Sequence, residues 1–429
     1  MKKFVEKALA KQAKRLLAKK KPFIIAITGS VGKSTTKKAV GTVLGHDFQV
    51  RWSPKNYNTE FGVPLTVLGL ETAGKSACGW MKNLFCGWCR STFPGKAYPD
   101  TLVLEMAADH PGDIAKLVDI AKPDIAIVTA VGESHAEFFG SVEGIAKEKA
   151  VLVEAVGKDG LVLLNRDDER VWQMRGQTKA RVLSFGFHDE AAVRAMPETV
   201  TYACWAEKGC GTHFKLATNG TKMPITIPGT FGTPAIYAVL AAFAIGKERG
   251  MNLVRMAEAL RSFVPPPGRL RYLPGIKNTT IVDDTYNSSP KSATIALEIL
   301  KSLPLQAADD KRFAVLGDML ELGSLSEEGH REIGRRVAEF GIDYLVLVGE
   351  RVNETKKAAV EAGMSQDRVL HFSTGEEAGR FVQERMKQGD VVLVKGSRKM
   401  QMERIVKELM ADPLWAAELL AGDHEEWRS

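Results

Sequence analysis

Short apolar runs alternate with longer stretches of helical periodicity from residue 21 to the end of the chain. In the first half, the clearest apolar runs lie at 23–28, 101–105, 125–129 and 161–164, with helical stretches at 34–44 and 142–156 between them. Continuous apolar runs are typical of strands covered on both faces, and their alternation with helices is typical of α/β folds. The pattern therefore predicts buried parallel strands with helices packed against them.

Three consecutive prolines interrupt this pattern at 264–268, in the segment Val-Pro-Pro-Pro-Gly. Proline excludes a continuing helix and stiffens a linker, so we predict a domain boundary there. Beyond it, runs at 279–283, 312–316, 344–348 and 391–394 again resemble strands separated by helices. The sequence thus predicts a central α/β domain with a mostly parallel sheet over 21–264, and a smaller, Rossmann-like α/β domain over 265–429.

The first 20 residues form a separate basic segment. Apolar side chains recur there at helical spacing among lysines, which predicts an amphipathic leader helix over 1–20. The apolar positions are Phe4, Val5, Ala8, Leu9, Leu16 and Leu17. Two interpretations stay open: the helix packs on its own domain, or its positive charge docks on an anionic membrane surface.

The segment 74–98 has little strand or helix periodicity and is interpreted as an insertion in the central domain. It gathers aromatic residues and cysteines, namely Trp80, Phe85, Trp88, Phe93, Cys78, Cys86 and Cys89. Lys82 and Arg90 accompany them. Either the aromatic side chains pack as a satellite core, or they act together with the leader at a lipid interface.

Composition narrows the class of protein. An apolar fraction of 45%, a charged fraction of 26% and the lack of a long apolar run are typical of a soluble globular protein, and 429 residues suit two domains. The first 21 residues carry a net charge of +8 within the total of +7, so the basic charge is local. Five cysteines argue against a disulfide framework, and no secretion signal is evident, which together predict a cytoplasmic protein.

One motif carries specific chemistry. After the run 23–28 the chain reads Gly29-Ser-Val-Gly32-Lys33-Ser34 and enters a predicted helix. Backbone N–H groups of such a loop and helix start hold phosphates, Lys33 adds positive charge, and Ser34 offers a hydroxyl to Mg²⁺. The usual pattern has glycine at position 27, where this chain has Ile27, so the loop is a variant. The central domain is thus of the P-loop type, with predicted ATP contacts at Gly29, Ser30, Val31, Gly32, Lys33, Ser34 and Thr35.

Two further polar side chains follow predicted strands. Glu105 ends the run 101–105, and His135 follows the run 125–129 after a short loop. Parallel α/β sheets place ligand-contacting groups beyond the carboxyl ends of their strands. Either residue alone would more often be structural, but their joint placement with Lys33 favours a role as metal ligands.

These residues resemble the Mur ligases, ATP-dependent amino-acid ligases of bacterial cell-wall assembly. The stretch 28–35 is similar to their Thr-Gly-Thr/Ser-x-Gly-Lys-Thr/Ser signature. Further matching segments, in the matching order, are Asn56-Tyr-Asn58, Gly62-Val-Pro64, Glu105, His135 and Asn165-Arg-Asp-Asp168. The second half resembles the branch that adds D-alanyl-D-alanine to a UDP-muramoyl tripeptide, through Gly268-Arg269, Asp283 to Pro290, Leu316 to Gly323 with His330, and Val394 to Arg398. The resemblance covers about residues 22 to 410.

The resemblance implies two Mg²⁺ ions beside ATP. Ser34 and Glu105 would serve one ion, and His135 and Lys149 the second. Lys149 would be carbamylated, because a lysine amine offers no ligand to Mg²⁺ whereas its carbamate supplies carboxylate oxygens. The alternative is that Lys149 is an ordinary solvated helix residue.

The resemblance also implies contacts from the second domain. Arg269 and Asp284 would reach the phosphates and the ribose of ATP, and Tyr286 and Asn287 would line the nucleotide site. The implied catalytic residues are Lys33, His135, Lys149 and Arg269. Substrate contacts are implied at Asn56, Asn58, Asp318, Glu321, Lys395, Ser397 and Arg398.

The chain departs from the family at the insertion 74–98, which is not part of the usual plan of this branch, and in two further places. Only about 21 residues precede the first predicted strand, where the family usually has a domain that grips the UDP-sugar substrate. The usual Gly-x-His-Asn-x-x-Asn run is here Gly232-Thr-Pro-Ala-Ile-Tyr-Ala238, so the adenine contacts stay open.

The expected reaction is that of an ADP-forming ligase. The γ-phosphoryl group of ATP passes to a substrate carboxylate, and an amine then displaces phosphate from the acyl phosphate. Expected partners are ATP, a carboxylate-bearing cell-wall precursor and an amino acid or dipeptide amine, with no nucleic acid. A monomer is expected, and peripheral contact with the inner face of the membrane through 1–20 and 74–98 stays open. The alternatives are a related ligase with another carboxylate and amine, or a non-catalytic ATP-binding scaffold of cell-wall assembly.

Overall fold

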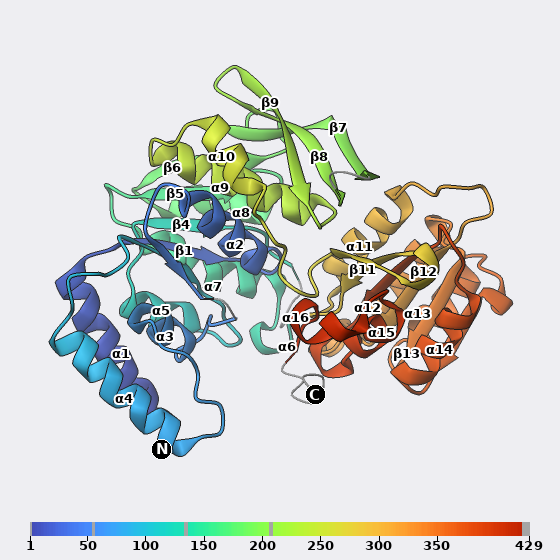
Figure 1. Cartoon of the computed structure of the whole chain (residues 1–429), viewed down its shortest axis with the longest axis horizontal. Helices are drawn as coiled ribbons and strands as arrows, with labels where there is room; N and C mark the ends of the chain where they lie inside the picture. The colour runs from blue at the N-terminus through green and yellow to red at the C-terminus, as the bar shows by residue number, and fades with distance from the viewer. Residues whose placement is uncertain (1, 54–55, 133–135, 206–208, 423–429) are drawn as a thin grey trace.

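The computed structural model describes residues 2–53, 56–132, 136–205 and 209–422. Figure 1 shows two halves, each built around one sheet. Within the described residues the first sheet has the strand order β2-β3-β1-β4-β5-β6-β7-β8-β9, and the second has the order β10-β11-β15-β12-β13-β14. Most neighbouring strands are parallel in both sheets, so the predicted α/β class with two mostly parallel sheets is confirmed.

The first sheet lies between two layers of helices. Its strands are β1 (Phe23–Thr28), β2 (Val50–Trp52), β3 (Thr101–Glu105), β4 (Ile125–Val128), β5 (Leu161–Asn165), β6 (Arg181–Gly186), β7 (Val193–Trp205), β8 (Gly209–Thr218) and β9 (Thr221–Pro228). The helices are α1 (Lys2–Lys20), α2 (Lys33–Leu44), α3 (Gly62–Leu68), α4 (Ala77–Thr92), α5 (Asp113–Ile120), α6 (Ala136–Phe139), α7 (Val142–Glu154), α8 (Glu169–Gln173), α9 (Thr233–Glu248) and α10 (Leu253–Leu260).

Successive residues of a strand point to opposite faces, and β1 shows why its sequence is apolar throughout. Ile25 and Ile27 belong to the core formed with α2, α9 and α10. Ile24 and Ala26 belong to the core formed with α1, α3, α5 and α7. Because both faces are covered, β1 and β3 end as buried strands that deliver the phosphate loop and Glu105 to the same edge of the sheet.

The leader helix α1 is part of the central core. Val5, Leu9 and Leu16 are buried, whereas Phe4 is 69% exposed. Of the two interpretations, packing of the leader on its own domain is thus what the structure shows. Helix α4 lies beside α1 (Figure 1), and Gln12 of α1 donates a hydrogen bond to the carbonyl of Leu84.

The expectation that 74–98 lacks helical structure is wrong. Residues Ala77–Thr92 form α4, which begins at Ser76, whose side chain accepts a hydrogen bond from the N–H of Gly79. The spacing of Met81, Phe85 and Trp88 fits a helix, but Gly79 and Gly87 within it have low helix propensity and weaken that signal. The cap and packing beside α1 stabilise the helix.

An antiparallel extension of the first sheet was not predicted. Strand β7 pairs antiparallel with β8, and β8 with β9. Cys210 on β8 is disulfide-bonded, against the expectation from the cysteine count, whereas Cys78, Cys86 and Cys89 are free. Within the described part of the chain, no helix is long and apolar enough to cross a membrane.

The second sheet carries the smaller half. Its strands are β10 (Arg271–Pro274), β11 (Thr280–Asp284), β12 (Arg312–Gly317), β13 (Tyr344–Val348), β14 (Val369–Phe372) and β15 (Val391–Lys395). The helices are α11 (Pro290–Ser302), α12 (Ser326–Glu339), α13 (Asn353–Glu361), α14 (Gly375–Arg385), α15 (Glu403–Leu409) and α16 (Ala416–Leu419). Helices α11, α12 and α13 share one core with the sheet, and α14, α15 and α16 share the other.

Candidate active site

The phosphate loop joins the end of β1 to the first turn of α2. At Gly29 the backbone has a φ of +147°, and a Cβ atom would lie 2.0 Å from Oγ1 of Thr129. At Gly32 φ is +89°, a left-handed conformation that favours glycine. The first N–H groups of a helix have no partner within it, so the start of α2 is suited to hold a phosphate group.

Lys33 begins α2 and folds back over the loop. Its Nζ atom lies 2.5 Å from the carbonyl oxygen of Gly29. Burial lowers the pKa of Lys33, and the charge of Glu105 opposes that shift. The role of Lys33 at the outer phosphates stays a prediction.

The loop that follows β4 braces the phosphate loop. Thr129 Oγ1 donates to the carbonyl of Val31 at 2.6 Å, and the N–H of Ser30 donates to the carbonyl of Ala130 at 2.7 Å. Ser30 Oγ exchanges two further hydrogen bonds with the backbone of Gly132, at 3.0 and 3.1 Å. The carboxyl ends of β1 and β4 therefore act as one rigid support.

Glu105 is the centre of a buried polar cluster. Its Oε1 atom accepts hydrogen bonds from Ser34 Oγ and Asn58 Nδ2, each at 3.2 Å, and its Oε2 atom lies 3.2 Å from Nζ of Lys37. Ser34 Oγ also lies 3.1 Å from Oδ1 of Asn56. Burial alone would raise the pKa of Glu105, but the charges of Lys37 and Lys33 lower it overall, so the carboxylate stays ionised.

This cluster has the donor chemistry that Mg²⁺ prefers. Ser34, Asn56, Asn58 and Glu105 supply hydroxyl, amide and carboxylate oxygens within one site. Among the described residues no group of three or more His, Cys, Asp or Glu forms a metal cluster, so a metal here would depend on these mixed oxygens and on the bound phosphates. His135, one of the two ligands predicted for a second ion, lies outside the described residues.

Lys149 lies on α7 and is buried. Burial, followed by the charge of Lys33, lowers the pKa of Lys149 to about 7, while the charges of Glu148 and Asp109 oppose the shift. The interpretation of Lys149 as an ordinary solvated lysine is therefore wrong. Its neighbour Lys147 is exposed.

The second half brings its own charged groups to the same place. Asp284, at the end of β11, accepts a hydrogen bond from Lys395 Nζ at 2.6 Å and from the N–H of Leu270 at 3.1 Å. Lys395 also donates to the carbonyl of Asn287 at 2.9 Å. Burial raises the pKa of Asp284 and lowers that of Lys395, while the attraction between the two charges opposes both shifts.

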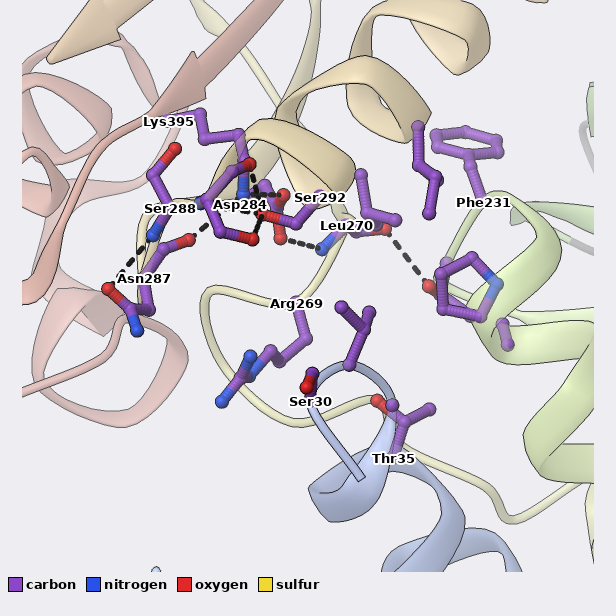
Figure 2. Close-up of a pocket in the computed structure, with 17 residues that line it drawn as sticks. Ser30, Thr35, Phe231, Arg269, Leu270, Asp284, Asn287, Ser288, Ser292 and Lys395 are labelled. Carbon is purple, nitrogen blue, oxygen red and sulfur yellow. Dashed lines mark hydrogen bonds and ion pairs between the residues drawn. The ribbon is translucent and has the colours of Figure 1, made fainter. Parts of the chain in front are cut away.

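One pocket is lined by residues of both halves. Figure 2 shows Ser30 and Thr35 of the phosphate loop facing Arg269, Asp284 and Asn287 of the second half. The full lining is Ser30, Val31, Gly32, Thr35, Thr230, Phe231, Pro234, Ala235, Arg269, Leu270, Asp284, Asn287, Ser288, Ser289, Ser292, Ile295 and Lys395. The pocket thus has a polar, charged side and an apolar side.

Tyr286 forms a further link between the halves. The Arg269 guanidinium lies 4.1 Å from the ring centre of Tyr286, a cation–π contact. The hydroxyl of Tyr286 accepts a hydrogen bond from Nδ2 of Asn56, which belongs to the first half. Tyr286, a predicted nucleotide residue of the second half, therefore contacts Asn56 of the polar cluster around Glu105.

The other predicted substrate residues are held by local contacts. The Asp318 carboxylate accepts backbone N–H groups of Glu350 and Val352 at 3.3 and 3.0 Å. Ser397 Oγ accepts the N–H of Leu320 at 2.8 Å. Arg398 pairs with Glu403 at 2.9 Å, and Glu321 has a left-handed φ of +61°. These residues shape the loops after β12 and β15, and their substrate role stays a prediction.

Three polar residues of the site were missed by sequence reasoning. Lys37 lies one helical turn after Lys33 and pairs with Glu105, which its position in Lys-Ser-Thr-Thr-Lys could have indicated. Thr129 and Lys291 hold the loops together, and nothing distinguishes either from the many threonines and lysines of this chain.

Comparisons with known proteins agree with this geometry. Residues 91–246 match the Mur ligase middle domain, and residues 268–398 match the Mur ligase, glutamate ligase domain. The UDP-N-acetylmuramoyl-tripeptide–D-alanyl-D-alanine ligase of Bacillus subtilis (strain 168) is 31% identical over 407 residues, 95% of this chain and 80% of that protein. The chain belongs to the Mur ligase family.

Other members of the family show similar likeness. The Mycobacterium leprae (strain TN) ligase of the same name is 32% identical over 94% of this chain and 77% of its own length. The crystal structure of MurF ligase from Thermotoga maritima in complex with ADP superposes with a TM-score of 0.76 at 27% identity, covering 94% of this chain and 83% of that chain. The Mur ligase fold is thus shown for both halves.

Proposed function

We propose that this Mur ligase joins an amine to a carboxylate of a cell-wall precursor at the expense of ATP, releasing ADP and phosphate. The substrates we infer are a UDP-muramoyl tripeptide and D-alanyl-D-alanine, because relatives that match over nine-tenths of the chain carry that name. The observation that carries the proposal is the pocket in which the phosphate loop of one half faces Arg269, Asp284 and Lys395 of the other.

The residues of the pocket suggest how ATP is held. The phosphates would lie on the N–H groups of the loop and the start of α2, with Lys33 and Arg269 supplying positive charge. The adenine would lie against the apolar side formed by Phe231, Pro234 and Ile295. Of these residues, Pro234 lies within 232–238, where the family usually has a polar run.

Charge stabilisation would then drive the transfer. Negative charge develops on the γ-phosphoryl group as it moves to the substrate carboxylate, and Lys33 and Arg269 are placed to offset it. Mg²⁺ held at Ser34 and Glu105 would supply further positive charge at the phosphates. The resulting acyl phosphate is attacked by the free amine, the C–N bond forms and phosphate leaves, with the amine proton passing to solvent or a base. Docking of the two halves would keep water from the acyl phosphate.

We further infer a second Mg²⁺ served by a carbamate on Lys149. A neutral lysine amine adds to CO₂, an N–C bond forms, and one proton is lost to give an anionic carbamate. Burial of Lys149 beside Lys33 keeps its amine uncharged more often than in solvent, and the product anion would gain from the charge of Lys33.

The decisive experiment is a coupled assay of phosphate release. Purified protein is incubated with ATP, UDP-muramoyl tripeptide and D-alanyl-D-alanine, and each substrate is omitted in turn. We expect release that depends on all three, and a fall of about 10² to 10³-fold in turnover for Lys33→Ala. Release with a different acid and amine would favour the related-ligase alternative. Nucleotide binding without release for any pair would favour the scaffold.

We also infer that the protein works as a monomer, because one chain supplies both sides of the pocket.

In addition, we infer peripheral contact with an anionic membrane through α1 and α4. Met81, Phe85 and Trp88 recur along α4 with large exposed apolar surfaces, and Phe93 is exposed just beyond it. The same two helices, α1 and α4, carry exposed basic residues, namely Lys3, Lys7, Lys11, Arg15, Lys19, Lys82 and Arg90. Apolar side chains flanked by positive charge are typical of interfacial helices.

Vesicle sedimentation tests this contact without removing α1, whose loss would expose the core. The wild-type protein should sediment with vesicles rich in phosphatidylglycerol and not with neutral ones. The triple variant Met81→Ser, Phe85→Ser, Trp88→Ser should stay in the supernatant. Leu414→Ser, which changes a side chain of equal character far from α4, is the matched control. Equal sedimentation of the triple variant and the control would exclude the contact.

A further inference from the structure

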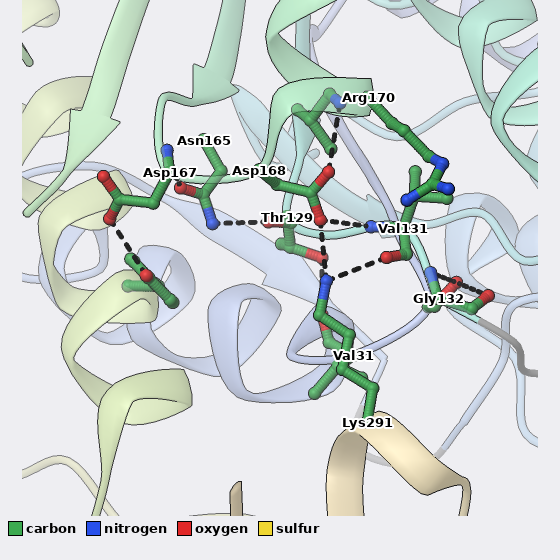
Figure 3. A network of polar contacts seen from close by, with 12 residues as sticks. Val31, Thr129, Val131, Gly132, Asn165, Asp167, Asp168, Arg170 and Lys291 are labelled. Carbon is green, nitrogen blue, oxygen red and sulfur yellow. Dashed lines mark hydrogen bonds and ion pairs between the residues drawn. The ribbon is translucent and has the colours of Figure 1, made fainter. Parts of the chain in front are cut away.

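A lysine of the second half reaches into the first half beside the phosphate loop. Lys291 stands in the first turn of α11, directly after the segment 287–289 that lines the pocket. Its Nζ atom donates to the carbonyl of Val131 and to Oδ2 of Asp168, both at 2.8 Å (Figure 3). Both acceptors belong to the first half.

The two acceptors are tied to each other and to the phosphate loop. Asp168 Oδ2 also accepts the N–H of Val131 at 3.0 Å. One residue earlier along this loop, Ala130 accepts the N–H of Ser30, and one residue later Gly132 is hydrogen-bonded to the Ser30 side chain. Figure 3 shows Lys291 entering this network from below, opposite Thr129 and Val131. Hydrogen bonds through residues 130–132 therefore connect Lys291 on α11 to Ser30 of the phosphate loop.

The charges favour the docked arrangement of the two halves. The Asp168 side chain is 9% exposed and that of Lys291 is 38% exposed. Asp168 has a structural role as the cap of α8, through a hydrogen bond from the N–H of Val171 at 3.2 Å. Within the described part of the chain, both hydrogen bonds of the Lys291 side chain go to the other half and neither goes to its own.

We propose that Lys291 is a positioning residue that fastens the second half over the phosphate loop and so sets the affinity for nucleotide. The proposal rests on the proposed function in one respect, that the pocket binds ATP. In solution the bond between Lys291 and Asp168 forms only when the halves dock. Nucleotide bound between the halves and the Lys291 contact therefore stabilise the same arrangement, so each strengthens the other.

The test measures binding of a non-hydrolysable ATP analogue with Mg²⁺ by calorimetry, which needs no acceptor substrate. Lys291→Ala should weaken binding by about two- to fivefold, the range expected for a partly exposed ion pair. Lys291→Arg should restore most of the affinity, because its guanidinium also donates to two acceptors. Lys356→Ala, at an exposed position on α13 of the same half, should bind like the wild type.

Two further measurements separate positioning from general stability. The thermal midpoint of unfolding without nucleotide should be nearly the same for Lys291→Ala and Lys356→Ala. In small-angle scattering with the analogue, Lys291→Ala should have a larger radius of gyration than Lys356→Ala. In turnover, the KM for ATP should rise more than kcat falls. Asp168→Asn combined with Lys291→Ala should weaken binding no more than the worse single variant.

Two results would contradict the positioning role of Lys291. Unchanged affinity and unchanged scattering in Lys291→Ala would overturn the positioning role and leave the proposed function intact. A wild-type protein that binds no analogue would overturn the nucleotide site itself, and this proposal with it.

Discussion

The proposed carbamate on Lys149 can be tested through its dependence on pH and CO₂. With a pKa of about 7, roughly nine-tenths of its amines are neutral at pH 8 and about one-tenth at pH 6. Since only the neutral amine reacts with CO₂, turnover in CO₂-depleted buffer should recover on addition of bicarbonate at pH 8 and recover little at pH 6. Labelled bicarbonate followed by carbon NMR should show a carbamate signal that Lys149→Ala lacks.

The neighbouring lysine provides the control for this prediction. Lys147 is exposed on the same helix, so Lys147→Ala should keep wild-type turnover and the carbamate signal. Turnover of Lys149→Ala should be low and should rise when short carboxylic acids are added, because they can occupy the position of the carbamate. Wild-type turnover in Lys149→Ala would remove the carbamate from the mechanism.

At the residue scale, motif residues were predictable and bracing residues were not. Lys33, Ser34 and Glu105 could be placed because a strand, a loop and a helix fix their relative positions through the backbone. Thr129 acts through hydrogen bonds to backbone carbonyl groups, and Lys291 acts through one carbonyl group and the Asp168 carboxylate. Any polar side chain of suitable length can make such a bond, so no residue type marks the position.

At the scale of elements, α1 should be indispensable to folding although its sequence looks like a leader. Leu9 is fully buried among the helices on one face of the first sheet, so Leu9→Ala should lower the free energy of unfolding by about 2–5 kcal/mol. Phe4, five residues earlier and exposed, is the control, and Phe4→Ala should change the free energy of unfolding by less than about 0.5 kcal/mol. Urea denaturation followed by circular dichroism measures both, and similar values for the two variants would contradict the packing of α1.

The pattern of apolar residues predicted some secondary-structure elements accurately and missed others. Strands β1, β3, β4 and β5 were predicted within one residue because both of their faces are buried, which makes the sequence apolar throughout. Helix α4 and the strands β7 to β9 were not predicted. In α4 the two glycines weaken the helical signal, and in β7 and β8 one face is solvated and polar, so these strands have no continuous apolar run.

At the scale of the whole molecule, the two α/β halves could be predicted, but their mutual placement could not. The contacts that dock them join positions far apart in the sequence, such as Asn56 with Tyr286 and Asp168 with Lys291. Each pair depends on the final orientation of two rigid bodies. Local pattern carries no information about that orientation, so the composition of the shared pocket follows only from the structure.

This shared pocket predicts that nucleotide stabilises both halves together through the Asn56–Tyr286 bond. A ligand at a hundredfold excess over its Kd adds about 2.7 kcal/mol to the stability of the state that binds it. Tyr286→Phe keeps the ring under Arg269 but removes the hydroxyl that accepts from Asn56. The rise in thermal midpoint caused by a fixed concentration of ATP analogue should therefore be smaller in Tyr286→Phe than in the wild type.

Asn56→Ala should reduce this rise at least as much, and the double variant should resemble Asn56→Ala. Tyr344→Phe, on β13 away from the pocket, should show the wild-type rise. An equal rise in all four variants would mean that nucleotide binds the first half alone.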